Sequence, residues 1–467
     1  MNEDIYIVLP GITGSVLQRG EKDVFGLTAE AGLQALFSGG RSLDDLRVDL
    51  HAPPGERPKD GVSAARVAPD AHLIPGLWKI DGYGALGTHV RTVQHSEERK
   101  NYFEFPYDWR LDNRIAAHDL HAQVTTWLST RRRKHPEAKA VLLAHSMGGL
   151  VSRYYLEVLG GWRDTRALVT FGTPHRGSLN ALDFLANGMR KAFGLVDLTS
   201  LVRSLPSVYQ LLPIYPCVDI GQGKLEYLTD VADRIPGIDP QAVVAARAFH
   251  QEIEDAVNRN AQSEEYLQSQ YGLSTVIGAE HPTKQSAVLT PSGLEALLTH
   301  NGQDLKGDGT VPRPAASPME WKDDRAAVFS GTRHGSLQNA PSILSHTAGW
   351  LGSSDVDLST WRNAGPVKLS VDLDDVYPAG EGIAFTVTPS RATLTLRYQL
   401  DQLTEVTPGP AESRASHGKG PITGKVAATD GTNYIDIPAQ PPGLYRLSVT
   451  GDKRVEPVSD LVVVAPR

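Results

Sequence analysis

A serine between two small residues, where an apolar run meets a helical pattern, most constrains the fold of this chain. Residues 140–144 are typical of a buried strand, and His145 separates them from Ser146. Ala144 and Gly148 flank the serine at two positions on either side, where small residues let a strand and a helix pass closely. Glycine is usual at both places, so Ala144 departs by one methyl group. The segment predicts a strained strand–turn–helix that presents the Ser146 hydroxyl; the alternative is an ordinary turn in which Ser146 caps the helix.

Further short apolar segments predict the other strands of a sheet that is covered on both faces. They are residues 5–9, 102–105, 167–171, 274–278 and 326–330. Helical patterns between several of these strands predict parallel, right-handed crossovers. We therefore predict an α/β domain with a mostly parallel sheet over residues 1–351. The proline-broken helical stretch at about 179–240 is too long for one crossover helix, and we interpret it as a helical lid.

Beyond residue 366 the hydrophobic pattern changes to a period of two. Apolar and polar residues alternate over 367–373 and 394–400, and apolar runs recur near 444–449 and 461–464. About seven short strands with Gly/Pro turns are typical of an immunoglobulin-like sandwich. We predict this all-β domain at 367–467, after a polar linker at 352–366. It could bind a protein partner or simply support the first domain.

Composition excludes several classes of protein. The 467 residues carry a formal net charge of −8, which gives no reason to expect nucleic acid as a partner. Cys217 is the single cysteine, so the chain can form neither an internal disulfide nor a metal site of several cysteines. The acidic start leads directly into an apolar strand, and no apolar run approaches the roughly 20 residues of a membrane span. We expect a cytoplasmic protein without cofactor or metal.

A nucleophilic serine needs a general base, because its hydroxyl is protonated at neutral pH. On the α/β-hydrolase scaffold the acid follows a late strand and the histidine follows the last one. Asp308, in the Gly-Asp-Gly turn at 307–309, and His334, after the strand at 326–330, satisfy both conditions. A calcium loop is the alternative for Asp308, but the spaced carboxylates of such a loop are missing. The rival histidines occupy unsuitable positions; they are His145, His175, His281, His300, His346 and His417.

A glycine-containing loop at residues 10–15 follows the first strand. This is where the scaffold places one backbone amide of its oxyanion hole, although a tight turn has the same composition. The second amide belongs to the residue after the nucleophile. Ile12 and Met147 are therefore the predicted backbone donors.

Several segments together resemble the lecithin:cholesterol acyltransferase family. They are residues 8–15, 105–110, the elbow at Ser146, 171–174 and 307–312. The resemblance covers the chain to about residue 350 and implies an α/β hydrolase that forms an acyl-serine and passes the acyl group to water or an alcohol. It implies the same triad, Ser146, Asp308 and His334, and the same oxyanion donors. We interpret Asp108 and Arg110 as a structural ion pair beside the site.

The leading functional hypothesis is a serine ester hydrolase that acts on acyl esters of lipids or phospholipids. The alternatives are an acyltransferase that uses an alcohol, and a catalytically silent scaffold that binds a partner through the sandwich. An acyl ester or lipid is the expected substrate, and peripheral contact with a membrane is compatible with this function.

Overall fold

The computed structural model describes residues 3–25, 45–53, 55–68, 72–74, 78–93, 100–191, 196–269, 271–351, 367–390, 394–405, 420–429, 431–452 and 455–465. The linker predicted at 352–366 lies outside these residues.

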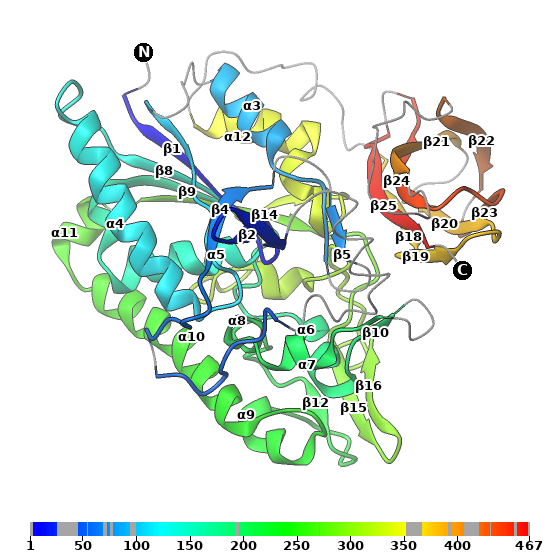
Figure 1. Ribbon diagram of the computed structural model, residues 1–467, viewed down its shortest axis with the longest axis horizontal. Coiled ribbons are helices and arrows are strands. Elements are labelled where there is room, and N and C mark those ends of the chain that lie inside the picture. The colour runs from blue at the N-terminus through cyan, green and yellow to red at the C-terminus, as the bar shows by residue number, and fades with distance from the viewer. Residues whose placement is uncertain are drawn as a thin grey trace.

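Six parallel strands form the central sheet, in the order β17-β14-β9-β8-β1-β7. They are β1 (Ile5–Leu9), β7 (Tyr102–Glu104), β8 (Ala140–His145), β9 (Thr165–Phe171), β14 (Gly272–Gly278) and β17 (Val328–Ser330). Each contains or overlaps an apolar run that predicted a strand. The strand that leads to Ser146, β8, lies inside the sheet between β1 and β9 (Figure 1). The predicted α/β fold with a parallel sheet is confirmed.

Helices cover both faces of this sheet. Ile5 and Ile7 of β1 belong to a core shared with one set of helices, whereas Tyr6 and Val8 belong to a separate core on the other face. The first set is α4 (Asn113–Arg131), α5 (Met147–Arg153) and α10 (Pro240–Asn260); the second is α3 (Gly84–Val93) and α12 (Pro341–Trp350). Because successive strand residues point to opposite faces, burial on both sides explains the uninterrupted apolar sequence.

The segment predicted as a lid contains short elements that pack near the carboxyl end of the sheet. They are α6 (Leu179–Asn187), β10 (Arg190–Lys191), β11 (Val196–Asp197), α7 (Thr199–Arg203), α8 (Pro206–Tyr209), β12 (Val218–Asp219), β13 (Leu225–Glu226), α9 (Leu228–Val231) and a 3-10 turn (Ala232–Arg234). Strands β12 and β13 join the hairpin of β15 (Ser286–Thr290) and β16 (Gly293–Leu297) in one four-stranded sheet. A later part of the chain therefore anchors this segment.

The remaining elements of the first part of the chain are short. They are β2 (Ser15–Arg19), β3 (Lys22–Phe25), β4 (Val62–Val67), β5 (His72–Ile74), β6 (Trp78–Ile80), a π-helical turn (Tyr154–Val158), α11 (Glu264–Ser269), and 3-10 turns at Gly161–Asp164, Arg313–Ala316 and His334–Asn339.

The C-terminal strands form two sheets with their own hydrophobic core. Their bounds are β18 (Leu369–Leu373), β19 (Val376–Pro378), β20 (Ile383–Pro389), β21 (Leu394–Glu405), β22 (Ile422–Ala428), β23 (Asn433–Ile437), β24 (Gly443–Thr450) and β25 (Val458–Ala465). All pairings are antiparallel except that of β19 with β25. The expected all-β region is thus present, and it lies beside the α/β part (Figure 1).

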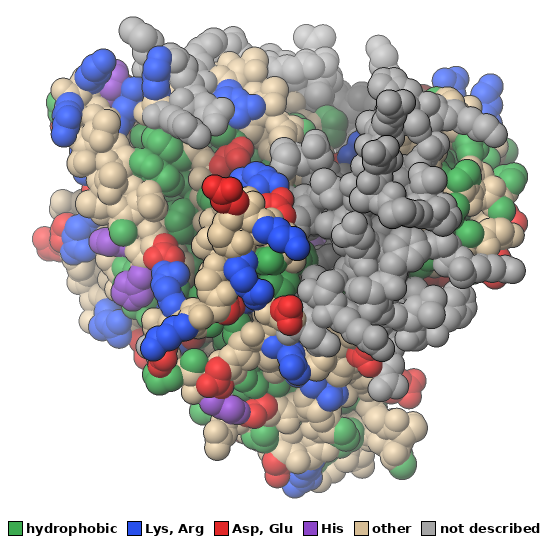
Figure 2. All heavy atoms as spheres, viewed as in Figure 1, with side chains coloured by type: hydrophobic (Ala, Val, Ile, Leu, Met, Phe, Trp, Pro, Cys, Tyr) green, Lys and Arg blue, Asp and Glu red, His purple; other side chains and the backbone are tan. Residues whose placement is uncertain are grey.

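The surface mixes both signs of charge. Figure 2 shows basic and acidic side chains interspersed with apolar ones on the face toward the viewer. Among the described residues, no helix has the length and apolar character needed to cross a bilayer. Cys217 is buried and unpaired.

Candidate active site

The turn between β8 and α5 has the strained geometry expected of a nucleophile elbow. Ser146 has φ 52° and ψ −125°, a conformation that is uncommon for a residue with a side chain. A Cβ atom on Gly148 would lie 2.5 Å from the carbonyl oxygen of Pro10, so this position needs glycine. Ala144 is paired with Leu9 and Thr170 inside the sheet, where its methyl group is fully buried. The departure from glycine at Ala144 is therefore tolerated.

Ser146, His334 and Asp308 form a hydrogen-bonded chain. His334 Nδ1 lies 2.7 Å from Asp308 Oδ2, and His334 Nε2 lies 2.9 Å from Ser146 Oγ. Since a carboxylate only accepts, Nδ1 carries the proton and Nε2 accepts from the serine hydroxyl. All three side chains are buried. The structure thus brings together the three residues that the sequence singled out.

Backbone amides fix the orientation of Asp308. Its Oδ1 accepts hydrogen bonds from the N–H groups of Thr310 and Val311, at 2.9 and 2.7 Å. Oδ2 is then left for the imidazole of His334. The backbone N–H of His334 also donates to the carbonyl oxygen of Asp308, at 3.0 Å, which ties the two loops together.

The loop after β1 lies directly against the serine. A Cβ atom on Gly11 would be 2.8 Å from Ser146 Cβ, so bare backbone passes beside the nucleophile. Ile12 follows in this loop. Met147 is the first residue of α5, and the N–H group of a first helical residue has no acceptor within its own helix. Both predicted donor residues are thus close to Ser146, and their role in an oxyanion hole stays a prediction.

Tyr83 and His145 connect the loop after β1 to His334. The Gly11 N–H donates to the Tyr83 hydroxyl at 2.7 Å, this hydroxyl lies 2.9 Å from His145 Nδ1, and His145 Nε2 lies 2.9 Å from the His334 carbonyl oxygen. Because the carbonyl can only accept, His145 donates from Nε2 and accepts from Tyr83. As expected, His145 is not the general base. It instead donates a hydrogen bond to the backbone carbonyl of His334, the predicted base. No spacing in the sequence signals this connection.

Removing the Tyr83 hydroxyl should weaken both loops at once. In Tyr83→Phe the Gly11 N–H and His145 Nδ1 lose a buried partner, which should lower the free energy of unfolding by about 1–3 kcal/mol. We expect ester turnover to fall as well, by about tenfold, because small displacements of reacting groups reduce rates strongly. Denaturant unfolding and initial rates measure the two effects. Tyr266→Phe is the control, since the hydroxyl of Tyr266 in α11 donates to Glu157 Oε1, outside this set of contacts, and the change should affect only stability. Wild-type rates in Tyr83→Phe would contradict this account.

The other buried histidines are neutral and serve the structure. Burial lowers the pKa of His281 and His250 to about 4, and lowers that of His175 well below its usual range. His281 Nε2 lies 2.7 Å from the Gly331 carbonyl oxygen and so supports the loop that leads to His334. In the described part of the chain, none of the three is hydrogen-bonded to Ser146.

The segment at residues 105–110 supports the loop after β1. The Tyr107 hydroxyl donates to the Pro10 carbonyl oxygen at 2.8 Å, and Trp109 Nε1 donates to that of Ser15 at 3.2 Å. Arg110 is fully buried and forms ion pairs of 2.7 Å with Asp108 and Asp60. The predicted pair of Asp108 and Arg110 is present and is structural.

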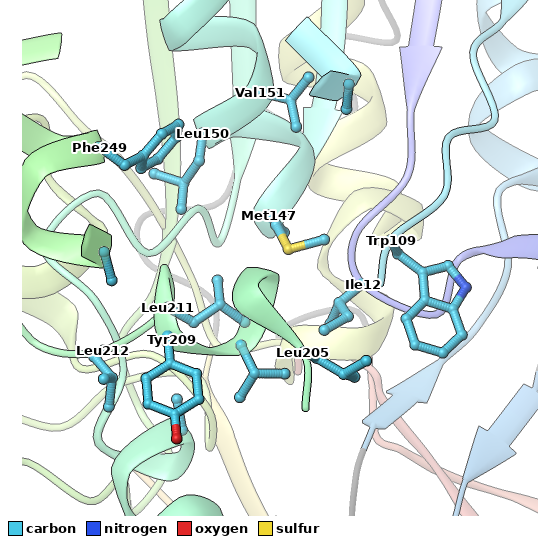
Figure 3. Close-up of a cluster of buried hydrophobic side chains, with 14 of the residues drawn as sticks. Ile12, Trp109, Met147, Leu150, Val151, Leu205, Tyr209, Leu211, Leu212 and Phe249 are labelled. Atoms are coloured by element: carbon cyan, nitrogen blue, oxygen red, sulfur yellow. The ribbon is translucent and has the colours of Figure 1, made fainter. Parts of the chain in front are cut away.

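Apolar side chains pack beside the two predicted oxyanion donors. Ile12 and Met147 face Leu205 and Leu211 from the segment predicted as a lid, and all four are buried (Figure 3). A separate cavity of about 390 Å³ reaches Asp308 and His334 and is lined in part by the C-terminal domain.

The parallel sheet, the strained turn and the Ser–His–Asp chain define an α/β hydrolase. Residues 78–271 match the family model described as lecithin:cholesterol acyltransferase. No curated protein gives a significant match to the sequence.

Solved lipases are among the similar structures. The lipase BlEst2 of Bacillus licheniformis in its mature form is 11% identical, over 72% of this chain and 86% of that chain, with a TM-score of 0.34. Its propeptide form is 10% identical over 98% and 93%, with a TM-score of 0.37. The phospholipase PlaB of Legionella pneumophila is 10% identical over 82% and 87%, with a TM-score of 0.32.

Proposed function

We propose that this chain is a serine ester hydrolase that acts on lipid acyl esters through an acyl-serine intermediate. The observation that carries the proposal is the hydrogen-bonded chain from Ser146 through His334 to Asp308 on a strained elbow. The match to the lecithin:cholesterol acyltransferase family supports an enzyme that acts on lipid esters. A silent scaffold has no chemical need for all three groups in this geometry.

The geometry supports a two-step acyl transfer. His334 Nε2 takes the hydroxyl proton as Ser146 Oγ bonds to the ester carbonyl carbon, and Asp308 stabilises the imidazolium. The N–H groups of Ile12 and Met147 would stabilise the oxyanion. The ester C–O bond then breaks, and His334 gives its proton to the leaving alcohol. In the second step water gives a proton to His334 and attacks the acyl-serine. The bond between Ser146 Oγ and the acyl carbon then breaks, and His334 returns the proton to Oγ, which releases the acid and restores Ser146.

The same site can transfer the acyl group when an alcohol replaces water. The apolar residues around Ile12 and Met147 favour a long acyl chain over a small polar acid. Acyl transfer to an alcohol is the second candidate function. An assay with an added long-chain alcohol distinguishes the two reactions, because hydrolysis releases a free acid and acyl transfer forms a new ester. The cytoplasmic location and contact with a membrane stay predictions.

Covalent labelling tests the proposal. We expect one fluorophosphonate adduct per chain by intact mass, because the probe reacts only with an activated serine, and no adduct in Ser146→Ala. Long-chain probes should label faster than short-chain ones. The control is Ser152→Ala, in the same helix, whose hydroxyl donates to the Gly148 carbonyl oxygen. An unlabelled wild-type protein, or a labelled Ser146→Ala variant, would contradict the proposal.

A further inference from the structure

His334 follows an edge strand of the central sheet. Among the described strands β17 pairs with β14 alone, whereas the strand before Ser146 lies inside the sheet. An edge strand leaves backbone and side-chain polar groups in need of partners on its open side. The loop from Ser330 to His334 therefore depends on whatever covers that side. In this chain the C-terminal domain contacts the end of that side, at Ser330 and Gly331.

Glu456, just before β25, binds the start of this loop. Its Oε1 accepts hydrogen bonds from the hydroxyls of Ser330 and Ser342, both at 3.0 Å, and its Oε2 accepts from the Gly331 N–H at 3.3 Å. Glu456 is buried, and its own N–H donates to the Val367 carbonyl oxygen, so it is fixed to the C-terminal domain. One buried carboxylate thus joins the edge strand, the loop and α12 to the second domain.

Arg333, next to His334 in sequence, makes a second set of contacts. Its Nε donates to the Val371 carbonyl oxygen at 2.9 Å, and its guanidinium lies 3.3 Å from Asp460 Oδ2. Asp460 is buried and Val371 is a core residue of the C-terminal domain. The side chain before the histidine is therefore anchored in the second domain.

The interface continues on the far side of His334. Arg446 of β24 pairs with Asp81, and the Asp81 N–H donates to the Gly335 carbonyl oxygen at 2.8 Å. Leu461 and Val463 of β25 belong to the hydrophobic core of the α/β part. Apolar packing and polar contacts thus join the C-terminal domain to the α/β part on both sides of His334 in the sequence.

We propose that the C-terminal domain is part of the catalytic apparatus, with Glu456 as a positioning residue that holds the loop of His334. This inference rests on the proposed function. The imidazole must stay within hydrogen-bonding distance of both Ser146 and Asp308, and the loop that carries it is bound by the second domain on its open side. The domain therefore acts on turnover through the position of His334 rather than on substrate affinity.

Turnover per labelled active site tests this proposal. We expect Glu456→Ala to lower kcat by about 10- to 100-fold with KM within about twofold, because it removes all three contacts and lets the histidine move. Fluorophosphonate titration counts only intact sites, so unfolded protein does not affect the result. Glu456→Gln should restore most of kcat, since its carbonyl can accept from Gly331 while the serine hydroxyls accept from its amide.

Asp401→Ala is the matched control, because Asp401 is a carboxylate of the same domain that hydrogen-bonds to Gln399 of its own strand. Asp460→Asn is the second test, and it replaces Glu456→Ala if that variant does not fold. In Asp460→Asn we expect kcat to fall without a change in KM, because the substitution weakens the pair with Arg333. A kcat within twofold of the wild type in both variants overturns the inference while the proposed function stands. An inactive, unlabelled wild-type protein overturns the proposed function instead.

Discussion

Replacing Asp308 with asparagine should lower ester turnover by about 10⁴-fold and leave the fold intact. The reason lies in the two backbone donors on this side chain. The N–H groups of Thr310 and Val311 require an acceptor at Oδ1, so the asparagine carbonyl must point to them and its NH₂ group to His334. His334 Nδ1 must then accept, which places the imidazole proton on Nε2. In that tautomer the histidine cannot take the proton of Ser146.

Steady-state kinetics with a chromogenic ester and thermal unfolding check this prediction together. KM and Tm should change little, since the variant has the same shape as the native side chain. Asp323→Asn is the control, because Asp323 is half-exposed and pairs only with Arg325 among the described residues. A turnover within tenfold of the wild type in Asp308→Asn would show that Asp308 does not set the tautomer of the base.

The sequence predicts those parts of the molecule that depend on local pattern. Strand β8 and the turn at Ser146 are visible because burial on both faces demands an apolar run and the elbow demands small residues beside the serine. Asp308 and His334 can be predicted because the α/β-hydrolase scaffold places the acid after a late strand and the histidine after the last one. These features need only short stretches of neighbouring residues.

The supports of the site depend on contacts between distant segments, which no local pattern contains. Tyr83 reaches Gly11 across 72 positions, and Glu456 reaches Ser330 across 126. His145 could be rejected as a base from its place in the strand, but its bond to the His334 carbonyl requires the folded sheet. Likewise, the pairing of β12 with β15 joins the segment predicted as a helical lid to a later β-hairpin.

The second large effect expected is on stability. Arg110→Met should lower the free energy of unfolding by about 3–5 kcal/mol, because it leaves Asp108 and Asp60 with an uncompensated buried charge. Burial alone would lower the pKa of Arg110, but its hydrogen bonds to Asp108 and Asp60 outweigh burial and raise it. The same pairing lowers the pKa of Asp60 against the opposing effect of burial. Urea denaturation at neutral pH measures the loss.

The pH dependence of the stability difference between the wild type and Arg110→Met tests whether the ion pairs cause it. A carboxyl group with a lowered pKa stabilises the fold above its ordinary range and loses this contribution as the pH falls, so the wild-type protein loses stability on acidification. Arg110→Met lacks the contribution at every pH. The difference in free energy of unfolding between the two proteins should therefore narrow as the pH falls below about 4, the ordinary pKa of an aspartic acid. Arg66→Met, which breaks an exposed pair with Asp23, should change stability by at most about 1 kcal/mol. A similarly small change in Arg110→Met would mean that this buried pair does not hold the loop beside Ser146.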